Sequence, residues 1–250
     1  MHSAQALTAK VALVTGAARR VGAEIARVLH QAGMRVALHY HTSETAARLL
    51  CEQFNQQRPQ SALAIAADLQ AADSENKLIQ QVIDQWQRLD VLVNNASQFY
   101  PTPLAEVTSA TWEALLHSNV KAPFFLAQAA APFLAAQQGS IINITDIHAE
   151  RPLKAYSVYC ISKAALLMAT KALAKELAPN VRVNAVAPGA VCWPEGDNAL
   201  SSTEQQKIID RTLLARAGSP SDIAKAVLFF VRDADYVTGQ ILSVDGGRSV

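Results

Sequence analysis

The chain has 250 residues, half of them apolar, and this length is enough to bury one large hydrophobic core. We therefore expect one domain over residues 1–250. The net charge is +1, from 22 basic and 21 acidic residues without a basic run, which argues against binding to nucleic acid or to an anionic membrane surface.

Short apolar runs of strand length recur along the chain, with helix-length segments between them. The runs span residues 11–15, 35–41, 62–67, 91–94, 140–145, 181–187 and 240–244. Runs that are apolar on both faces are typical of a parallel sheet covered by helices on each side. Apolar residues at helical spacing follow in segments 21–31, 44–56, 74–88 and 162–177. The sequence predicts a doubly wound α/β fold.

The segment from Gly189 to about Leu200 shows neither the apolar pattern of a strand nor that of a helix, and it contains Trp193. A loop of this length in a compact domain is typical of a lid or a binding loop. A disordered insertion is the alternative for its tip.

The first predicted strand leads directly into a turn, Thr15-Gly-Ala-Ala-Arg-Arg-Val-Gly22, and then into a helix. Gly16 permits a tight turn, Gly22 permits close packing of the helix, and the exposed amides at the helix start can receive a phosphate. A corner with two glycines also arises for packing reasons alone. Arg20 stands where many such turns have a middle glycine, and it brings a permanent charge to the place of a diphosphate or a polar ligand edge.

The second predicted strand ends at His39-Tyr-His-Thr-Ser43, and no Asp or Glu occurs before Glu44. A site for NAD usually has a carboxylate here, which accepts from the ribose 2′-hydroxyl. Its absence favours NADP, whose 2′-phosphate can be bound by His41, Thr42, Ser43 and Arg19. The alternative is a polar loop that binds nothing.

Tyr159 and Lys163 are four residues apart, so on a helix they lie on one face. A phenol with a pKa near 10 is a poor acid–base group at neutral pH unless a cation lowers that pKa. Lys163 is the expected cation. Taken alone, the pair also fits two ordinary surface residues.

Further motifs accompany this pair in a fixed order: Asn94-Asn-Ala96, Asn119, Pro188-Gly189 and Asp245-Gly-Gly247. With the turn at Gly16, they make the whole chain resemble the short-chain dehydrogenase/reductase family. The resemblance implies a seven-stranded Rossmann-like sheet and a nicotinamide cofactor. It also implies that Tyr159 donates a proton, that Lys163 binds the nicotinamide ribose and that Asn119 assists a proton relay.

One position departs from that family. The usual catalytic serine lies thirteen residues before the tyrosine, and Asp146 stands there. A serine can donate a hydrogen bond to a substrate carbonyl, whereas a carboxylate can only accept one. Asp146 is therefore expected to hold the Tyr159 hydroxyl or to face the donor-rich edge of a nitrogen heterocycle. A disabled enzyme is the alternative.

Four segments resemble the pteridine reductase branch of this family: the arginine-containing turn, Leu38-His-Tyr-His41, residues 94–103 and the Asp146/Tyr159/Lys163 set. The resemblance implies that Phe99 stacks on a pterin, that Ser97 and Arg20 touch the pterin or the cofactor phosphates, and that Asp68 and Leu69 border the adenine. The residues it assigns to the cofactor are Gly16, Arg19, Arg20, Val21, His41, Thr42, Ser43, Asp68, Leu69, Asn95, Ala96, Ser97, Tyr159, Lys163, Pro188 and Gly189. The branch typically has arginine where this chain has Thr42. This difference weakens the expected binding of the 2′-phosphate.

These patterns predict an NADPH-dependent pteridine reductase that reduces C=N bonds of dihydropterin, with oxidised pterin and folate as further candidate substrates. The residues expected to contact the substrate are Arg20, Ser97, Phe99, Asp146 and Tyr159. A short-chain carbonyl reductase, such as a 3-oxoacyl reductase, is the first alternative, and a non-catalytic NADP-binding sensor is the second. The family resemblance and the apolar segment 122–136 suggest a homotetramer.

Two observations bear on location. No apolar stretch approaches the roughly 20 residues of a membrane-spanning helix, and residues 1–10 do not resemble a secretion signal. The three cysteines, Cys51, Cys160 and Cys192, form no C-x-x-C pair, which suits a reducing compartment and makes a structural metal improbable. We expect a cytoplasmic protein without a metal.

Overall fold

A parallel sheet of seven strands lies at the centre of the computed structural model, which describes residues 7–193 and 199–250. The strand order is β3-β2-β1-β4-β5-β6-β7, and every neighbouring pair is parallel. The strands are β1 (Val11–Val14), β2 (Arg35–Tyr40), β3 (Ala62–Ala66), β4 (Val91–Asn94), β5 (Ser140–Ile144), β6 (Arg182–Pro188) and β7 (Ile241–Val244). The predicted doubly wound α/β fold is confirmed.

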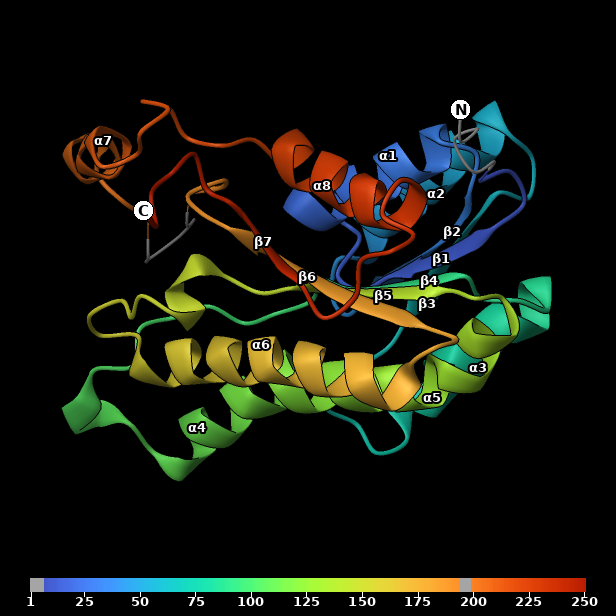
Figure 1. The fold of residues 1–250 in the computed structure, drawn as a ribbon, viewed down its shortest axis with the longest axis horizontal. Coiled ribbons are helices and arrows are strands. Elements are labelled where there is room, and N and C mark those ends of the chain that lie inside the picture. The colour runs from blue at the N-terminus through green and yellow to red at the C-terminus, as the bar shows by residue number, and fades with distance from the viewer. Residues whose placement is uncertain (1–6, 194–198) are drawn as a thin grey trace.

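Helices cover both faces of the sheet (Figure 1). On one face lie α1 (Arg20–Gln31), α2 (Glu44–Gln57) and α8 (Pro220–Arg232). On the other lie α3 (Ser74–Trp86), α4 (Ser109–Leu116), α5 (Ala122–Ala136) and α6 (Ser157–Leu177). The shorter elements are η1 (Leu104–Glu106), the π-helix η2 (His117–Lys121), η3 (Ile147–Ala149) and α7 (Ser202–Asp210).

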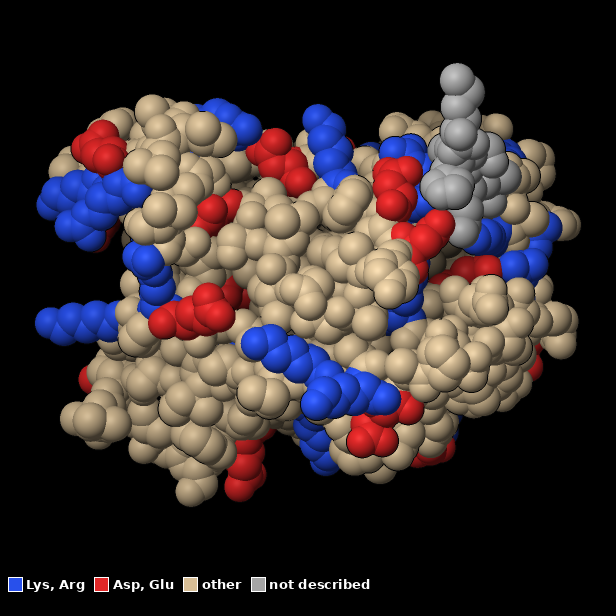
Figure 2. Space-filling model, in the orientation of Figure 1, with Lys and Arg blue, Asp and Glu red and all other residues tan. Residues whose placement is uncertain are grey.

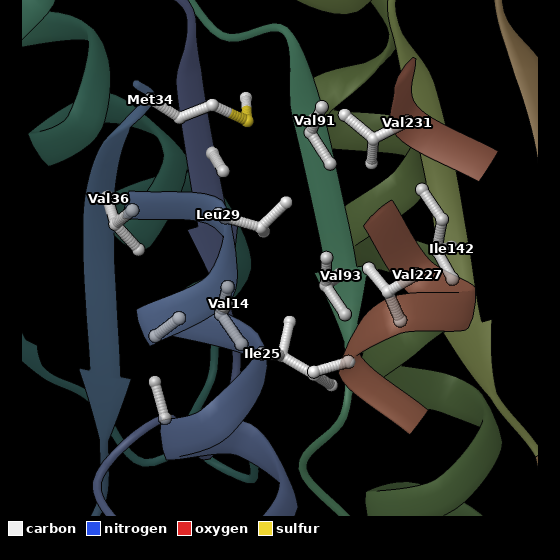
Figure 3. Packing of buried hydrophobic residues seen from close by; sticks show 14 of the residues in the cluster. Val14, Ile25, Leu29, Met34, Val36, Val91, Val93, Ile142, Val227 and Val231 are labelled. Carbon is white, nitrogen blue, oxygen red and sulfur yellow. The ribbon is translucent and has the colours of Figure 1, made fainter. Parts of the chain in front are cut away.

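The alternation of side chains along each strand divides the core into two clusters. In β1, Ala12 and Val14 belong to the cluster under α1 and α8, whereas Val11 and Leu13 belong to the cluster under α3, α5 and α6. In the first cluster, Ile25 and Leu29 of α1 lie beside strand residues such as Val14 and Val93 (Figure 3). The continuous apolar character of the strands follows from this burial on both faces.

Most predicted element boundaries differ from the structure by one or two residues, but the helix expected over 162–177 begins at Ser157. Tyr159 therefore lies in its first turn and shares the helix with Lys163. Helices α7 and α8 were not predicted, although each begins with a capping box. Ser219 accepts from the Asp222 amide in α8, and Ser201 accepts from the Glu204 amide in α7.

Helix α6 corrects the expectation that no segment reaches the length of a membrane span. Its 21 residues include a window with a mean hydropathy of 1.2, which meets the length and composition of a span. Half of that window is buried inside the fold, and the helix contributes Leu166 and Leu173 to the protein interior. The core helix of a globular domain has these same properties.

On the face shown in Figure 2, basic and acidic side chains are interspersed, so this face carries no extended area of one sign. The predicted lid or binding loop leaves β6 at Gly189, and its residues 194–198 lie outside the described residues. The prediction for its tip therefore stays a prediction.

The strand order reverses between β1 and β4, because β2 and β3 extend to one side and β5 to β7 to the other. In open α/β sheets, ligands bind at this switch point, outside the carboxyl ends of the strands. The segments that leave these ends begin at Thr15, Asn95, Thr145 and Gly189. The fold thus brings most of the predicted site residues to one edge.

Candidate active site

The turn after β1 is clamped by Asn95, which follows β4. The Asn95 side-chain amide donates to the carbonyl oxygens of Thr15 (2.8 Å) and Gly16 (3.2 Å). The Thr15 hydroxyl in return accepts from the backbone amides of Asn95 and Ala96. Gly16 has a φ of +62°, a conformation that favours glycine, and a Cβ on Gly22 would collide with the Gly16 carbonyl oxygen. Both glycines therefore meet the requirements that the sequence suggested.

The first amides of the turn are bound to β2 and do not face outward. The Gly16 amide donates to Nδ1 of His39 (3.1 Å), and the Ala17 amide donates to the His39 carbonyl oxygen (2.9 Å). These two amides are anchored to β2, so a phosphate has to be received further along, at the start of α1. The first amides of any helix lack partners inside the helix, and the N-cap residue Arg19 supplies no side-chain cap.

Arg20 has a φ of +54°, which explains why a glycine is common at this position. Its guanidinium donates to the carbonyl oxygen of Trp193 at 2.7 Å. Trp193 belongs to the segment after β6. Arg20 therefore connects the predicted binding loop with the turn 15–22, called the phosphate turn below because a phosphate is predicted to bind there. The contact with a cofactor or substrate that was expected for Arg20 stays a prediction.

At the end of β2, His41 and Thr42 are exposed and Ser43 is half-buried. Nε2 of His41 lies 4.0 Å from the Asp68 carboxylate, which follows β3. The structure thus brings together two segments predicted to border the adenosine half of the cofactor. Leu69 is partly buried and packs against the core, and its predicted contact with the adenine stays a prediction.

At the end of β6, the Gly189 amide donates to the Val244 carbonyl oxygen. A Cβ on Gly189 would lie only 2.7 Å from the Asp245 side chain, so a larger residue would displace the Asp245 turn. Pro188 precedes it at the end of the strand. Their predicted contact with the cofactor stays a prediction.

Asp146 and Tyr159 form the shortest contact of the site: the phenol hydroxyl donates to Oδ2 of Asp146 at 2.6 Å. The carboxylate is held from the other side, because its Oδ1 accepts from the His148 amide at the start of η3. Tyr159 is only 4% exposed. Burial, followed by the negative charge and the hydrogen bond of Asp146, raises the pKa of Tyr159 well above its ordinary value.

Burial and Asp146 therefore outweigh the effect expected of Lys163, which as a cation favours the phenolate. The Lys163 ammonium donates to the Ile144 carbonyl oxygen at 3.0 Å and lies 5.8 Å from the centre of the Tyr159 ring. Burial lowers the pKa of Lys163 to about 8, against the opposing effect of Asp146. The phenol therefore donates to Asp146 while a buried ammonium lies beside its ring.

Asn119 lies in the π-helix η2, a local widening that is frequent at functional sites. Its side-chain oxygen accepts from the Gln98 amide (2.8 Å), and its nitrogen donates to the Gln98 carbonyl and to Oγ of Ser162 (3.0 Å). Ser162 directly precedes Lys163. These contacts position α6 and the segment after β4, and the relay role of Asn119 stays a prediction.

Phe99 is 38% exposed, so its side chain is not part of the hydrophobic core. Its ring stacks on Tyr156 with centroids 4.6 Å apart and meets the Tyr159 ring edge-on at 4.8 Å. Ser97, two residues earlier, is exposed. Tyr156 was not predicted as a site residue, and its position three residues before Tyr159 was the available signal.

Two cavities lie near the ends of the strands. One, of about 430 Å³, is at the carboxyl edge and is lined by Ala190, Leu213, Leu214 and the turn 245–247. The other, of about 290 Å³, is lined by Lys10, Asp90 and Arg182 at the opposite edge, away from Tyr159. Within residues 7–193 and 199–250, no group of three His, Cys, Asp or Glu could hold a metal ion.

Comparison with known proteins gives matches over nearly the whole chain. Residues 16–249 match the family model described as enoyl-(acyl carrier protein) reductase. Pteridine reductase 1 of Leishmania tarentolae is 38% identical, over 97% of this chain and 97% of that protein. A 3-oxoacyl-[acyl-carrier-protein] reductase of Synechocystis is 37% identical, over 97% and 98%. A blue fluorescent protein from a metagenomic library, solved in complex with NADPH, has a TM-score of 0.91 at 35% identity and covers 98% of this chain and 100% of its own.

The Asp146–Tyr159 contact leads to a prediction about proton affinity. Replacing Asp146 by Asn removes a negative charge beside the phenol, so we expect Tyr159 to ionise at a lower pH in Asp146→Asn than in the wild type. Ultraviolet difference titration of tyrosinate measures this, and Tyr159→Phe in each background identifies the signal. An unchanged midpoint would show that the carboxylate does not act on the phenol.

Proposed function

The chain belongs to the short-chain dehydrogenase/reductase family, and we propose that it is an NADPH-dependent pteridine reductase that reduces C=N bonds of dihydropterin. Oxidised pterin and folate are further proposed substrates. The observation that carries the proposal is the carboxylate of Asp146 at 2.6 Å from the Tyr159 hydroxyl.

The chemistry of this pair favours a heterocycle over a ketone. A carbonyl oxygen needs donors, and of the two groups only the phenol can donate. Pterin carries ring N–H and amino donors, which a simple ketone lacks. Asp146 can accept from such a donor while Tyr159 faces the ring nitrogen that is reduced. The same carboxylate would repel the oxygen of a simple ketone.

Reduction of C=N adds a hydride to carbon and a proton to nitrogen. When bound, NADPH supplies the hydride. Tyr159 supplies the proton as the general acid, with the substrate nitrogen replacing Asp146 as the acceptor of its hydroxyl. Lys163, 5.8 Å from the ring centre, stabilises the phenolate that results. Phe99 offers one flat face to a bound pterin, which fixes the orientation of the ring.

The residues around the phosphate turn fit a dinucleotide. Gly16 and Gly22 allow the turn and α1 to approach each other closely, and the start of α1 has no side-chain cap that would compete with a phosphate. No carboxylate occurs in the segment 39–43 that ends β2, which fits a 2′-phosphate better than a free hydroxyl. Exposed His41 and Thr42 are the proposed contacts at that end.

A 3-oxoacyl reductase is the second candidate. The Synechocystis relative covers 97% of this chain at an identity one percentage point below that of the pteridine reductase, so overall similarity does not separate the two. Both candidates use Tyr159 and Lys163. They differ in the role of Asp146, which can accept from a pterin donor but would repel a ketone oxygen. The substrate assay therefore decides between the two candidate functions.

Consumption of NADPH measured with dihydrobiopterin, dihydrofolate and a 3-oxoacyl ester tests the proposal. We expect turnover of dihydropterin and little turnover of the ester.

Tyr159→Phe should reduce turnover by roughly two orders of magnitude or more, because it removes the general acid, while NADPH still binds. Asp146→Ser should lower dihydropterin turnover and permit some ketone reduction. Turnover of the ester alone by the wild type would favour the 3-oxoacyl reductase.

Cofactor preference gives a separate prediction. We expect a markedly lower kcat/KM with NADH than with NADPH, because a 2′-phosphate gains polar contacts at the end of β2 that NADH lacks. Thr42→Arg should strengthen the binding of NADPH, because it adds a cation at an exposed position. Thr42→Ser is the matched control, since it keeps the hydroxyl. Equal use of both cofactors by the wild type would contradict the preference.

We also propose a homotetramer. Large apolar side chains are exposed on α5 and α6, with Phe124 at 39%, Phe125 at 40% and Met168 at 60% exposure. A solvent-exposed apolar surface of this kind marks an interaction site. Light scattering at micromolar concentration should give four times the chain mass of 26.8 kDa, and a monomer would contradict the proposal.

A cytoplasmic location is part of the proposal. Cys51, Cys160 and Cys192 are all free thiols in the structure, as a reducing compartment requires.

A further inference from the structure

His39 is a buried histidine on β2 that the proposed reaction does not use. Its side chain is 2% exposed and lies between two segments of the proposed cofactor site. Nδ1 accepts from the Gly16 amide at 3.1 Å, and Nε2 lies 3.1 Å from the Ala67 carbonyl oxygen. Gly16 belongs to the phosphate turn, and Ala67 immediately precedes Asp68 at the adenosine end.

These two partners leave a single protonation state for the imidazole. The Gly16 amide can only donate, so Nδ1 has to carry a lone pair. The Ala67 carbonyl can only accept, so Nε2 has to carry the proton. The other neutral tautomer would oppose N–H to N–H at Gly16 and a lone pair to a lone pair at Ala67. An imidazolium would lose the Gly16 contact as well.

We propose that His39, as the neutral Nε2–H tautomer, is the positioning residue that fixes the phosphate turn relative to the adenosine end of the cofactor site. The inference rests on the proposed function, because it assigns the turn to the diphosphate of a dinucleotide. It is independent of which substrate is reduced.

Three further observations support this role. Burial is the main cause that lowers the pKa of His39 to about 4, so the ring is neutral at pH 7. The Ala17 amide donates to the backbone oxygen of His39, so this residue holds two successive amides of the turn. Asn95 holds the carbonyl oxygens of Thr15 and Gly16 from the opposite side. The turn is thus fixed between β2 and β4 before any ligand arrives.

The arrangement explains how the turn can bind phosphate although its first amides are occupied. With Gly16 and Ala17 anchored, the uncapped first turn of α1 is directed at a fixed place. Loss of the Nδ1 acceptor would leave the half-buried Gly16 amide without this partner and would let the turn move. Binding of the diphosphate should weaken, and it should weaken equally for NADP⁺ and NAD⁺, since both contain it.

Calorimetric titration of the purified chain with NADP⁺ and NAD⁺ tests the proposal. His39→Leu should weaken the binding of both dinucleotides by roughly tenfold, about the effect of one half-buried donor that loses its partner. His39→Asn should restore binding to within a few-fold of the wild type, because the amide oxygen can stand near the place of Nδ1 and accept from Gly16. Equal binding by His39→Leu and the wild type would overturn the proposal.

His30 provides the matched control. It is also a buried histidine with a pKa lowered to about 4, but its ring contacts Ser61 and Phe54, away from the turn. His30→Leu should lower the melting temperature and leave both dissociation constants unchanged. If His30→Leu weakens binding as much as His39→Leu does, the effect is general destabilisation and the proposal is wrong.

Nitrogen NMR of the wild-type histidines tests the same contact without a variant, including the case in which His39→Leu does not fold. We expect a protonated Nε2 and an unprotonated Nδ1 for His39 at pH 7, and the opposite tautomer or an imidazolium would overturn the proposal. A wild-type chain that binds neither dinucleotide would refute the proposed function instead. The tautomer would then still decide the His39 contact.

Discussion

The reversal of strand order between β1 and β4 is the constraint on which the site depends. Strands on the two sides of this point send their connections to opposite faces, so the segments after β1 and β4 separate and leave a crevice at the carboxyl edge. Asn95 then ties the two segments together through the Thr15 and Gly16 carbonyl oxygens. Hydrogen bonds thus join residues nearly 80 positions apart in the sequence. They fix the position of the phosphate turn relative to the sheet.

Burial determines the chemistry at the other end of the site. Tyr159 and Lys163 share the first two turns of α6, and both are almost inaccessible to water. Desolvation disfavours the charged form of each group, which raises the pKa of the phenol and lowers that of the amine. Asp146 reinforces the first effect and opposes the second. The result is a tyrosine that keeps its proton until a substrate displaces its bond to the carboxylate.

The sequence predicts the sheet well because short apolar runs alternate with helix-length segments along the whole chain, a rhythm typical of a doubly wound parallel sheet. It predicts the Asp146–Tyr159 contact from spacing and resemblance, since both residues lie on elements of fixed relative position. It does not reveal that the Gly16 amide bonds to His39, because the register of β2 against the turn depends on tertiary packing. For the same reason, the raised pKa of Tyr159 is not predicted, because burial outweighs the nearby cation and helical spacing does not report burial.

Arg20 shows how the two ends of the site are connected. A left-handed conformation costs a non-glycine residue roughly 1 kcal/mol, and it persists only where surrounding contacts maintain it. The bond to the Trp193 carbonyl oxygen is such a contact, and it joins the turn after β1 to the segment after β6. A glycine would adopt the same backbone without strain but would leave that segment without this tie. The strained arginine therefore has a physical reason: it couples the turn after β1 to the segment after β6.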